Sequence, residues 1–326
     1  MKNSFKKEGS SVKTVERLVK VAWKTNAALT LLVFFALFCL LLSAVGLLVD
    51  HRLLSGEPAW GKPFKFSVSF AAYGATLIWM TRFLGGHQQK FYRLVCMAAL
   101  SGTVVELSAI IIQVARQTTG HFNADTPLDT ALWFAIRLAI FPASQAVAVM
   151  FALLMREPNL PPVMGSAIRC EAFLTLAGIV PGAIMLLPDH FQGTITLHQL
   201  LHCHTIGHPE GGPVFPCVGW SKVAGDLRIA HFIGIHALQV LPLVGFAIMR
   251  FLPFLPMAKQ RLLVWNVGFL YSGVIAALTW QAILGQPLFK PSQIISTGFA
   301  LLLALSFLSA LVTMIARPAL AGAVKE

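Results

Sequence analysis

The chain has 326 residues, of which 56% are hydrophobic and 12% are charged, and its formal net charge is +12. Soluble domains carry about 25% charged residues, so this composition excludes an ordinary soluble domain and indicates a polytopic membrane protein. Five cysteines are too few for a disulfide-stabilised scaffold, and the positive charge is interpreted first as membrane topology.

The chain begins with a basic leader, residues 1–25, which precedes the first apolar run. That run is long enough to cross a membrane, and no small-x-small cleavage pattern follows it. We therefore expect a retained first helix rather than a cleaved signal peptide. Residues 26–326 are predicted to form a single transmembrane domain.

Eight apolar runs of spanning length follow the leader, since a bilayer core of about 30 Å needs about 20 helical residues. Lipid offers no partners for free backbone groups, so each run is predicted to be helical. The predicted fold class is therefore all-α, a polytopic bundle of about eight spans, and no internal repeat is evident. The predicted spans are approximately Ala27–Val49, Phe66–Thr81, Leu94–Ala115, Leu132–Met155, Ile168–Leu187, Ile229–Met249, Leu262–Leu284 and Ile294–Ala316.

The loops between these runs set the orientation, because Lys and Arg favour the cytoplasmic side. With both termini in the cytoplasm, most of the 25 Lys and Arg residues lie on that side. Their charge then anchors the inner face to anionic membrane lipid. Nucleic-acid binding is not expected, because the basic residues follow the topology rather than clustering with aromatic residues.

The longest loop, residues 188–228, lies outside in this topology and is rich in histidine. A spacing of four places His198 and His202 on one face of a helix. His204 and His208 repeat that spacing before a turn rich in Gly and Pro. Imidazole is a common ligand of Cu, Zn and Fe, so these four histidines are predicted metal ligands, with haem as the other cofactor considered. The alternative is a polar lid that binds no metal.

Two cysteines of this loop, Cys203 and Cys217, face an oxidising compartment if the topology holds. A disulfide between them would close the turn. Thiolate ligation by Cys203 and two free thiols are the alternatives. The other cysteines, Cys39, Cys96 and Cys170, lie in or beside spans and are predicted to be small packing residues.

The sixth predicted span carries two histidines after Asp226, which is a predicted N-cap. On a regular helix, His231 and His236 point about 140° apart, which disfavours a single metal held by both. His236 shares a face with Gln239. His231, His236 and Gln239 are predicted to bind a cofactor. Pro242 is the predicted site of a kink.

Other polar residues lie inside spans, where ionisable groups usually face a bundle interior or a cavity. Glu106 and Gln113 share a face of the third span, and Arg137 lies in the fourth at a depth that allows a Glu106–Arg137 pair. With His236 and Gln239 of the sixth span, and Trp280 and Gln281 of the seventh, they are predicted to gather in the outer half of the membrane as a polar site from four spans. The alternative is a structural network that fixes helix register. Glu171 is interpreted as an interface residue near the inner end of its span.

The segment "GDLRIAHFIGIHALQVLPL" resembles a family of bacterial integral membrane proteins of unknown function. The matching residues are Gly225–Arg228, His231, Phe232 and His236–Gln239, and the resemblance extends to "GEPAWGKPFKF" and "LTWQAILGQPL". It implies a multi-pass protein of the bacterial inner membrane and carries no activity with it.

Three functional hypotheses follow from these patterns. The first, which the histidine pattern favours, is a redox or metal protein whose histidines hold Cu, Zn, Fe or haem and which acts on a small molecule, a quinone or a lipid. The second is a transporter of a small polar solute or of protons, with Glu106, Arg137, His236 and Gln239 at its site. The third is a structural or assembly subunit. Walker A, Gly-x-Ser-x-Gly and dinucleotide motifs are absent, and whether the chain is an enzyme stays open.

Overall fold

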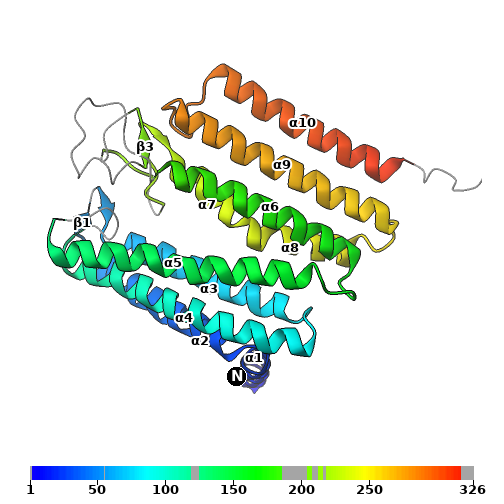
Figure 1. Cartoon of the computed structure of the whole chain (residues 1–326), viewed down its shortest axis with the longest axis horizontal. Coiled ribbons are helices and arrows are strands. Elements are labelled where there is room, and N and C mark those ends of the chain that lie inside the picture. Colours follow the sequence, from blue (N-terminus) through cyan, green and yellow to red (C-terminus); the bar gives the residue numbers. More distant parts are fainter. Residues whose placement is uncertain are drawn as a thin grey trace, which may run out of the picture. The chain divides into compact units, whose positions relative to one another are not determined.

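The computed structural model describes residues 2–54, 56–118, 125–185, 204–207, 212–215 and 218–316, with side chains from residue 13 onward. These residues form ten helices and four two-residue strands (Figure 1). They divide into two compact units, one with helices α1–α5 and one with helices α6–α10. Each unit is described by itself below.

The first unit is built around α2, which packs between α3 and α4, while α5 packs along α4. The neighbour order is therefore α3–α2–α4–α5. The phenol hydroxyls of Tyr73 and Tyr92 donate to the carbonyls of Ala143 and Ala146, at 2.8 and 3.0 Å, and tie α3 and α4 to α5. The helices are α1 (Lys2–Thr25), α2 (Ala27–Val49), α3 (Gly61–Thr81), α4 (Gly86–Ala115) and α5 (Pro127–Leu154).

The second unit is built around α6, which packs on α7, α8 and α9, while α10 packs on α9 (Figure 1). The neighbour order is therefore α8–α6–α9–α10. Two short strands, β3 (Thr205–Ile206) and β4 (Gly225–Asp226), pair antiparallel just before α7. The helices are α6 (Pro162–Ile184), α7 (Leu227–Ile235), α8 (Ala237–Phe251), α9 (Met257–Ile283) and α10 (Gln293–Ile315).

Six of the described helices are long and apolar enough to cross a membrane: α2, α4, α5, α6, α9 and α10. The pair α7 and α8 makes a seventh candidate, broken by a bend of 44°. The chain is therefore an all-α, multi-pass membrane protein. Helix α3 is 21 residues long but is not among these candidates, so the eighth span and the cytoplasmic termini stay predictions.

Close helix crossings in both units are made at glycines. A Cβ atom built on Gly178 of α6 would lie 2.5 Å from the Cα atom of Gly234 of α7. One built on Gly102 of α4 would lie 2.3 Å from the carbonyl oxygen of Ala139 of α5. Lipid tails are as apolar as leucine side chains, so helices in membranes associate largely by packing that small residues permit.

The sequence predicted a kink at Pro242, but the break between α7 and α8 lies at His236. His236 ends α7 and begins α8, and Pro242 lies inside α8 without breaking it. The predicted N-cap is confirmed, because the carboxylate of Asp226 accepts from the backbone N–H of Arg228. The cysteines Cys39, Cys96 and Cys170 are free and buried, as predicted.

An ion pair holds the turn between α2 and the hairpin of β1 (Leu53–Leu54) and β2 (Glu57–Pro58). Arg52 Nε donates to the Asp50 carboxylate at 2.8 Å, and Trp60 Nε1 donates to it at 2.8 Å. These two hydrogen bonds, with the charge of Arg52, hold the pKa of Asp50 well below its ordinary value.

The lowered pKa of Asp50 predicts an acid-dependent loss of stability. The paired carboxylate stabilises the fold fully above its unfolded pKa of about 4 and loses that contribution as pH falls toward its lower folded pKa. Asp50→Asn should therefore lower the thermal-unfolding midpoint at neutral pH, and the difference from wild type should shrink on acidification. Midpoints measured in detergent across acidic pH test this, and two parallel curves would contradict it.

Candidate intramembrane polar site

With Asn26, Ser67 and Gln88, Glu106 is one of four described residues that have a buried polar atom without a hydrogen-bond partner. It lies on the buried stripe of α4 with Thr103, Leu107 and Ile110, and only 3% of its surface is exposed. Its Oε2 atom is buried and has no hydrogen-bond partner among the described residues. The charge of the Lys62 ammonium, in the first turn of α3, acts on the Glu106 carboxyl.

Arg137 does not pair with Glu106, so the predicted ion pair is wrong. No salt bridge of the described residues joins them, and the Arg137 guanidinium instead lies over the Trp133 ring, 3.9 Å from its centroid. Arg137 and Trp133 are four residues apart on α5, so this cation–π contact lies within one helix face. The contact satisfies the cation without a carboxylate.

Gln113, two turns beyond Glu106 on the same buried stripe, belongs to a network that joins the ends of α4 and α5. Gln113 Nε2 donates to Asp129 Oδ1 at 3.0 Å, and Arg116 Nη1 donates to the same oxygen. Thr126 Oγ1 donates to Asp129 Oδ2 at 2.6 Å and accepts from the backbone N–H of Asp129. Asp129 is therefore the centre of the network, with 2% of its side chain exposed.

Sequence reasoning missed Asp129 and Arg116 as partners of Gln113. One signal was present, because Thr126 and Asp129 have the spacing of a helix N-terminal capping box. The residues that Asp129 joins are far apart in sequence, however, and lie on both sides of the α4–α5 loop. Their contact depends on the pairing of the two helices, which no local pattern reports.

The histidines of α7 have separate partners. His231 Nδ1 lies 2.7 Å from the carbonyl oxygen of Gly178 and must carry the proton there, because a carbonyl only accepts. His236 Nδ1 lies 3.0 Å from Gln239 Oε1, which confirms the predicted shared face. The Phe232 ring packs on the His236 ring at a centroid distance of 4.2 Å. Cofactor binding by these residues stays a prediction.

Glu171, which the sequence placed near the inner end of its span, is buried in the protein, with 1% of its surface exposed. The sequence placed the start of this span at Ile168, whereas α6 begins at Pro162, so Glu171 lies about 14 Å along the helix. Thr175 Oγ1 donates to Glu171 Oε1 at 3.4 Å. Glu171 is thus a second buried carboxyl, but one with a hydrogen-bond donor.

The predicted gathering of polar residues from four spans falls in two units. Glu106, Gln113 and Arg137 belong to the first unit, and His236 and Gln239 belong to the second. Within the first unit, Gln113 belongs to the Asp129 network, and Arg137 stacks on the Trp133 ring of its own helix. Glu106 is left as the distinctive group of that unit.

The histidine-rich loop is described only in part. His204 is half-buried, and its carbonyl oxygen accepts from the Leu227 N–H at 3.0 Å, which joins the loop to the start of α7. In the described ranges, no group of three or more His, Cys, Asp or Glu side chains could hold a metal ion. The other predicted loop residues, His198, His202, His208, Cys203 and Cys217, lie outside the described residues.

No protein-family model, no curated protein and no solved structure matches this chain. The site is therefore interpreted from its own geometry. Its distinctive feature in the first unit is a carboxyl at membrane depth, on a buried helix stripe, with one oxygen atom lacking a partner.

Proposed function

We propose that the chain is a proton-coupled transporter of a small polar solute, in which Glu106 binds and releases the proton. The observation that carries this proposal is the buried Oε2 atom of Glu106, which has no hydrogen-bond partner in the part of the chain that the structure describes. A location in the bacterial inner membrane, with both termini cytoplasmic, belongs to the same proposal and rests on the Lys and Arg distribution.

The chemistry of an isolated buried carboxyl supports proton binding. Removing one carboxylate from water costs several kcal/mol unless a partner compensates for it. Glu106 has no such partner at Oε2, so the closed, dry state favours the neutral acid, and entry of water favours the carboxylate. A group whose charge follows its access to water can couple proton movement to opening and closing. Ionisable residues inside spans commonly have such roles.

Other polar groups lie along α4 between Glu106 and the carboxyl end of the helix. Gln113 lies on the same buried stripe, about 10 Å nearer the end of α4, within the Asp129 network. Lys62 contributes a positive charge from the start of α3. Amide, carboxylate and ammonium side chains therefore lie toward this end of the first unit, beyond Glu106.

The redox hypothesis has less support than the transporter. Its metal ligands, His198, His202 and His208, lie outside the described residues, and His204 belongs to no metal-binding group within them. No observation on the described residues favours a structural or assembly subunit over a transporter. The unpartnered oxygen of the buried Glu106 carboxyl is the observation that supports the transporter hypothesis.

The transporter proposal predicts that Glu106→Gln removes proton binding from the folded protein. Proteoliposomes on a solid-supported membrane should give a transient current after a pH step, because a proton moves to the buried carboxyl. Glu106→Gln should abolish this current, since an amide cannot take up the proton.

Glu171→Gln is the matched control for this experiment, because Glu171 is equally buried but has a hydrogen-bond donor. It should retain the current, and size-exclusion profiles should show that both variants are folded. An undiminished current in Glu106→Gln would overturn the proposal. If the wild type gives the current and Glu106→Gln does not, a panel of small polar solutes can be tested for transport by the wild type under an imposed pH gradient.

A further inference from the structure

Helix α1 has an exposed apolar stripe. Val15, Leu18 and Trp23 lie within about 140° of one another around the helix, at 100° per residue. Their exposed fractions are 57%, 64% and 48%. Val19 and Ala22, in the middle of the stripe, are half-buried, so the other described residues cover only part of it.

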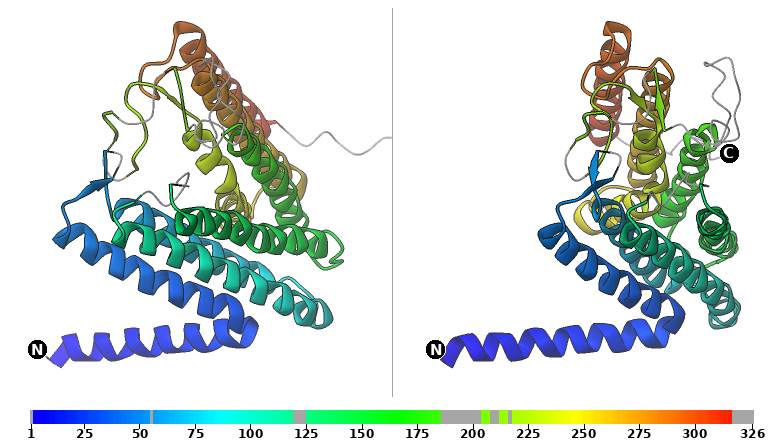
Figure 2. Two further views of the ribbon diagram at one scale, coloured as in Figure 1. Left: turned by 60° about the vertical axis from the view of Figure 1, so that its left-hand side comes forward. Right: turned by 90° about the vertical axis from the view of Figure 1, so that its left-hand side faces the viewer.

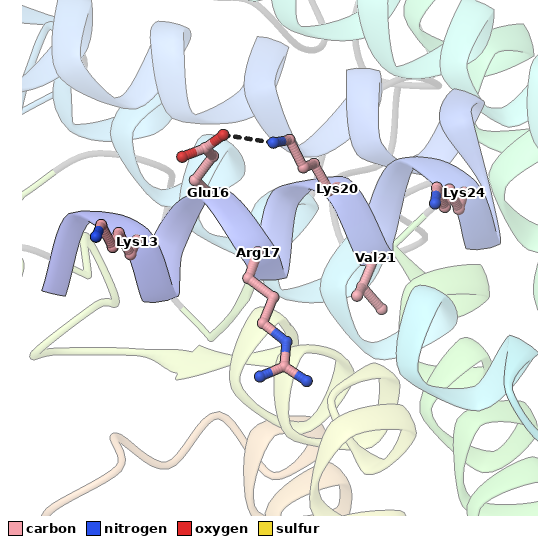
Figure 3. A pocket seen from close by; sticks show the side chains of 6 residues that line it. All are labelled: Lys13, Glu16, Arg17, Lys20, Val21 and Lys24. Carbon is pink, nitrogen blue, oxygen red and sulfur yellow. Dashed lines mark hydrogen bonds and ion pairs between the residues drawn. The ribbon is translucent and has the colours of Figure 1, made fainter. Parts of the chain in front are cut away.

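The opposite side of α1 is cationic. Figure 3 shows Lys13, Arg17, Lys20 and Lys24 spreading over this side, with Glu16 paired to Lys20. The Lys20 and Glu16 side chains of that ion pair are 70% and 59% exposed. Because Glu16 neutralises only one of the four cations, this side of the helix keeps an excess of positive charge. The helix is therefore amphipathic, with cations on the side away from the apolar stripe.

The carboxyl end of α1 is fixed to the first unit. Arg93 of α4 donates from Nη2 to the Lys24 carbonyl at 2.8 Å and from Nε to the Thr25 carbonyl at 3.1 Å. Asn26 then adopts an extended conformation, and its side chain caps α2 by accepting from the Leu29 N–H. The chain turns at this point: in Figure 1, α1 is seen nearly end-on where α2 lies across the view.

We infer that α1 is a surface helix that binds the anionic lipid headgroups of the membrane that the chain spans. The turn at Asn26 places the carboxyl end of α1 beside one end of the membrane-crossing helices α2 and α4, where the headgroups lie, and α1 diverges from α2 from that point (Figure 2). The apolar stripe would enter the boundary between headgroups and acyl chains, as in other interfacial helices. The long Lys and Arg side chains would reach sideways to lipid phosphates.

The composition of α1 favours lipid over an acidic protein as the occupant. Trp23 lies on the apolar stripe, and tryptophan is enriched at membrane interfaces. Four cations along one side match a continuous anionic surface without requiring a pocket. A cationic helix also follows the rule that Lys and Arg collect on the cytoplasmic side, where anionic lipid is found.

The test uses the full chain in nanodiscs of phosphatidylcholine, with and without phosphatidylglycerol, and measures hydrogen–deuterium exchange of the α1 amides. Exchange in α1 should be about tenfold slower in anionic nanodiscs, because each surface cation adds to the attraction. Replacing Lys13, Arg17, Lys20 and Lys24 together with Gln, which keeps helix propensity, should remove this dependence on anionic lipid. Exchange in α2 serves as the internal control and should not change.

A second variant separates the apolar contribution. Leu18→Ser with Trp23→Ser should speed α1 exchange in both kinds of nanodisc. Equal α1 exchange in neutral and anionic nanodiscs for the wild type would overturn the inference. Slowing by heparin in neutral nanodiscs, without an effect of phosphatidylglycerol, would also overturn it and would assign the cationic side to an acidic macromolecule.

Discussion

Gly178→Ala is expected to lower the thermal-unfolding midpoint sharply, because the added methyl group meets backbone rather than a side chain. Its Cβ would lie 2.5 Å from the Cα of Gly234, 2.6 Å from its carbonyl carbon and 2.8 Å from the amide nitrogen of Ile235. Over-packing usually costs about 1–3 kcal/mol, and the upper end applies where two helix backbones must separate. The same shift would move the Gly178 carbonyl away from His231.

The matched control is Gly298→Ala in α10, where a Cβ would have no heavy atom within 4 Å. Alanine is the better helix former by about 1 kcal/mol, so this variant should keep or raise the midpoint. Midpoints can be followed with a fluorogenic thiol dye, since Cys39, Cys96 and Cys170 are buried and become reactive on unfolding. Equal midpoints for the two variants would show that the α6–α7 crossing tolerates a methyl group.

Asp129→Ala is expected to have the second large effect, because one substitution removes a partner from Gln113, Arg116 and Thr126 together. Breaking a fully buried ion pair costs about 3–5 kcal/mol, chiefly through the group that is left unpaired. The Arg116 side chain is 30% exposed and can be hydrated, so we expect about 2 kcal/mol. The thiol-dye midpoint should fall accordingly, and the link between the ends of α4 and α5 should loosen.

Glu16→Gln provides the comparison for Asp129→Ala. It breaks an ion pair whose two side chains are 59% and 70% exposed, and such pairs contribute about 0–1 kcal/mol. Its midpoint should therefore stay close to that of the wild type. If Asp129→Ala shifted the midpoint no more than Glu16→Gln, the buried network around Asp129 would contribute no measurable stability.

The apolar runs of the sequence predicted most of the helices but not all of their ends. The range Ala27–Val49 matches α2 in full, whereas α4 begins at Gly86 rather than at Leu94. The residues in between include Lys90 and Arg93, which are helical but too polar to lie in lipid. Hydropathy marks the part of a helix that suits the membrane interior, and the helix continues beyond it.

Side-chain partners were harder to predict than helices. Glu106 was identified from its position inside a span, but its pairing with Arg137 was inferred from depth alone. Depth does not fix the rotation of one helix against another, and Arg137 turned out to stack on Trp133 within its own helix. The burial of Glu171 was missed for a related reason, because its position along the span does not show which face of α6 packs against other helices.

The order of helices in each unit has an evolutionary consequence. In the first unit four consecutive helices lie in the order α3–α2–α4–α5, and the order recurs as α8–α6–α9–α10 if α7 and α8 are counted as one broken helix. A Ser–Gly pair marks corresponding helices, with Gly102 facing α5 and Gly273 facing α10. Four residues after these glycines stand Glu106 and Ala277. If one ancestral half was duplicated, the halves have since diverged in role, because only one has a carboxyl at this position.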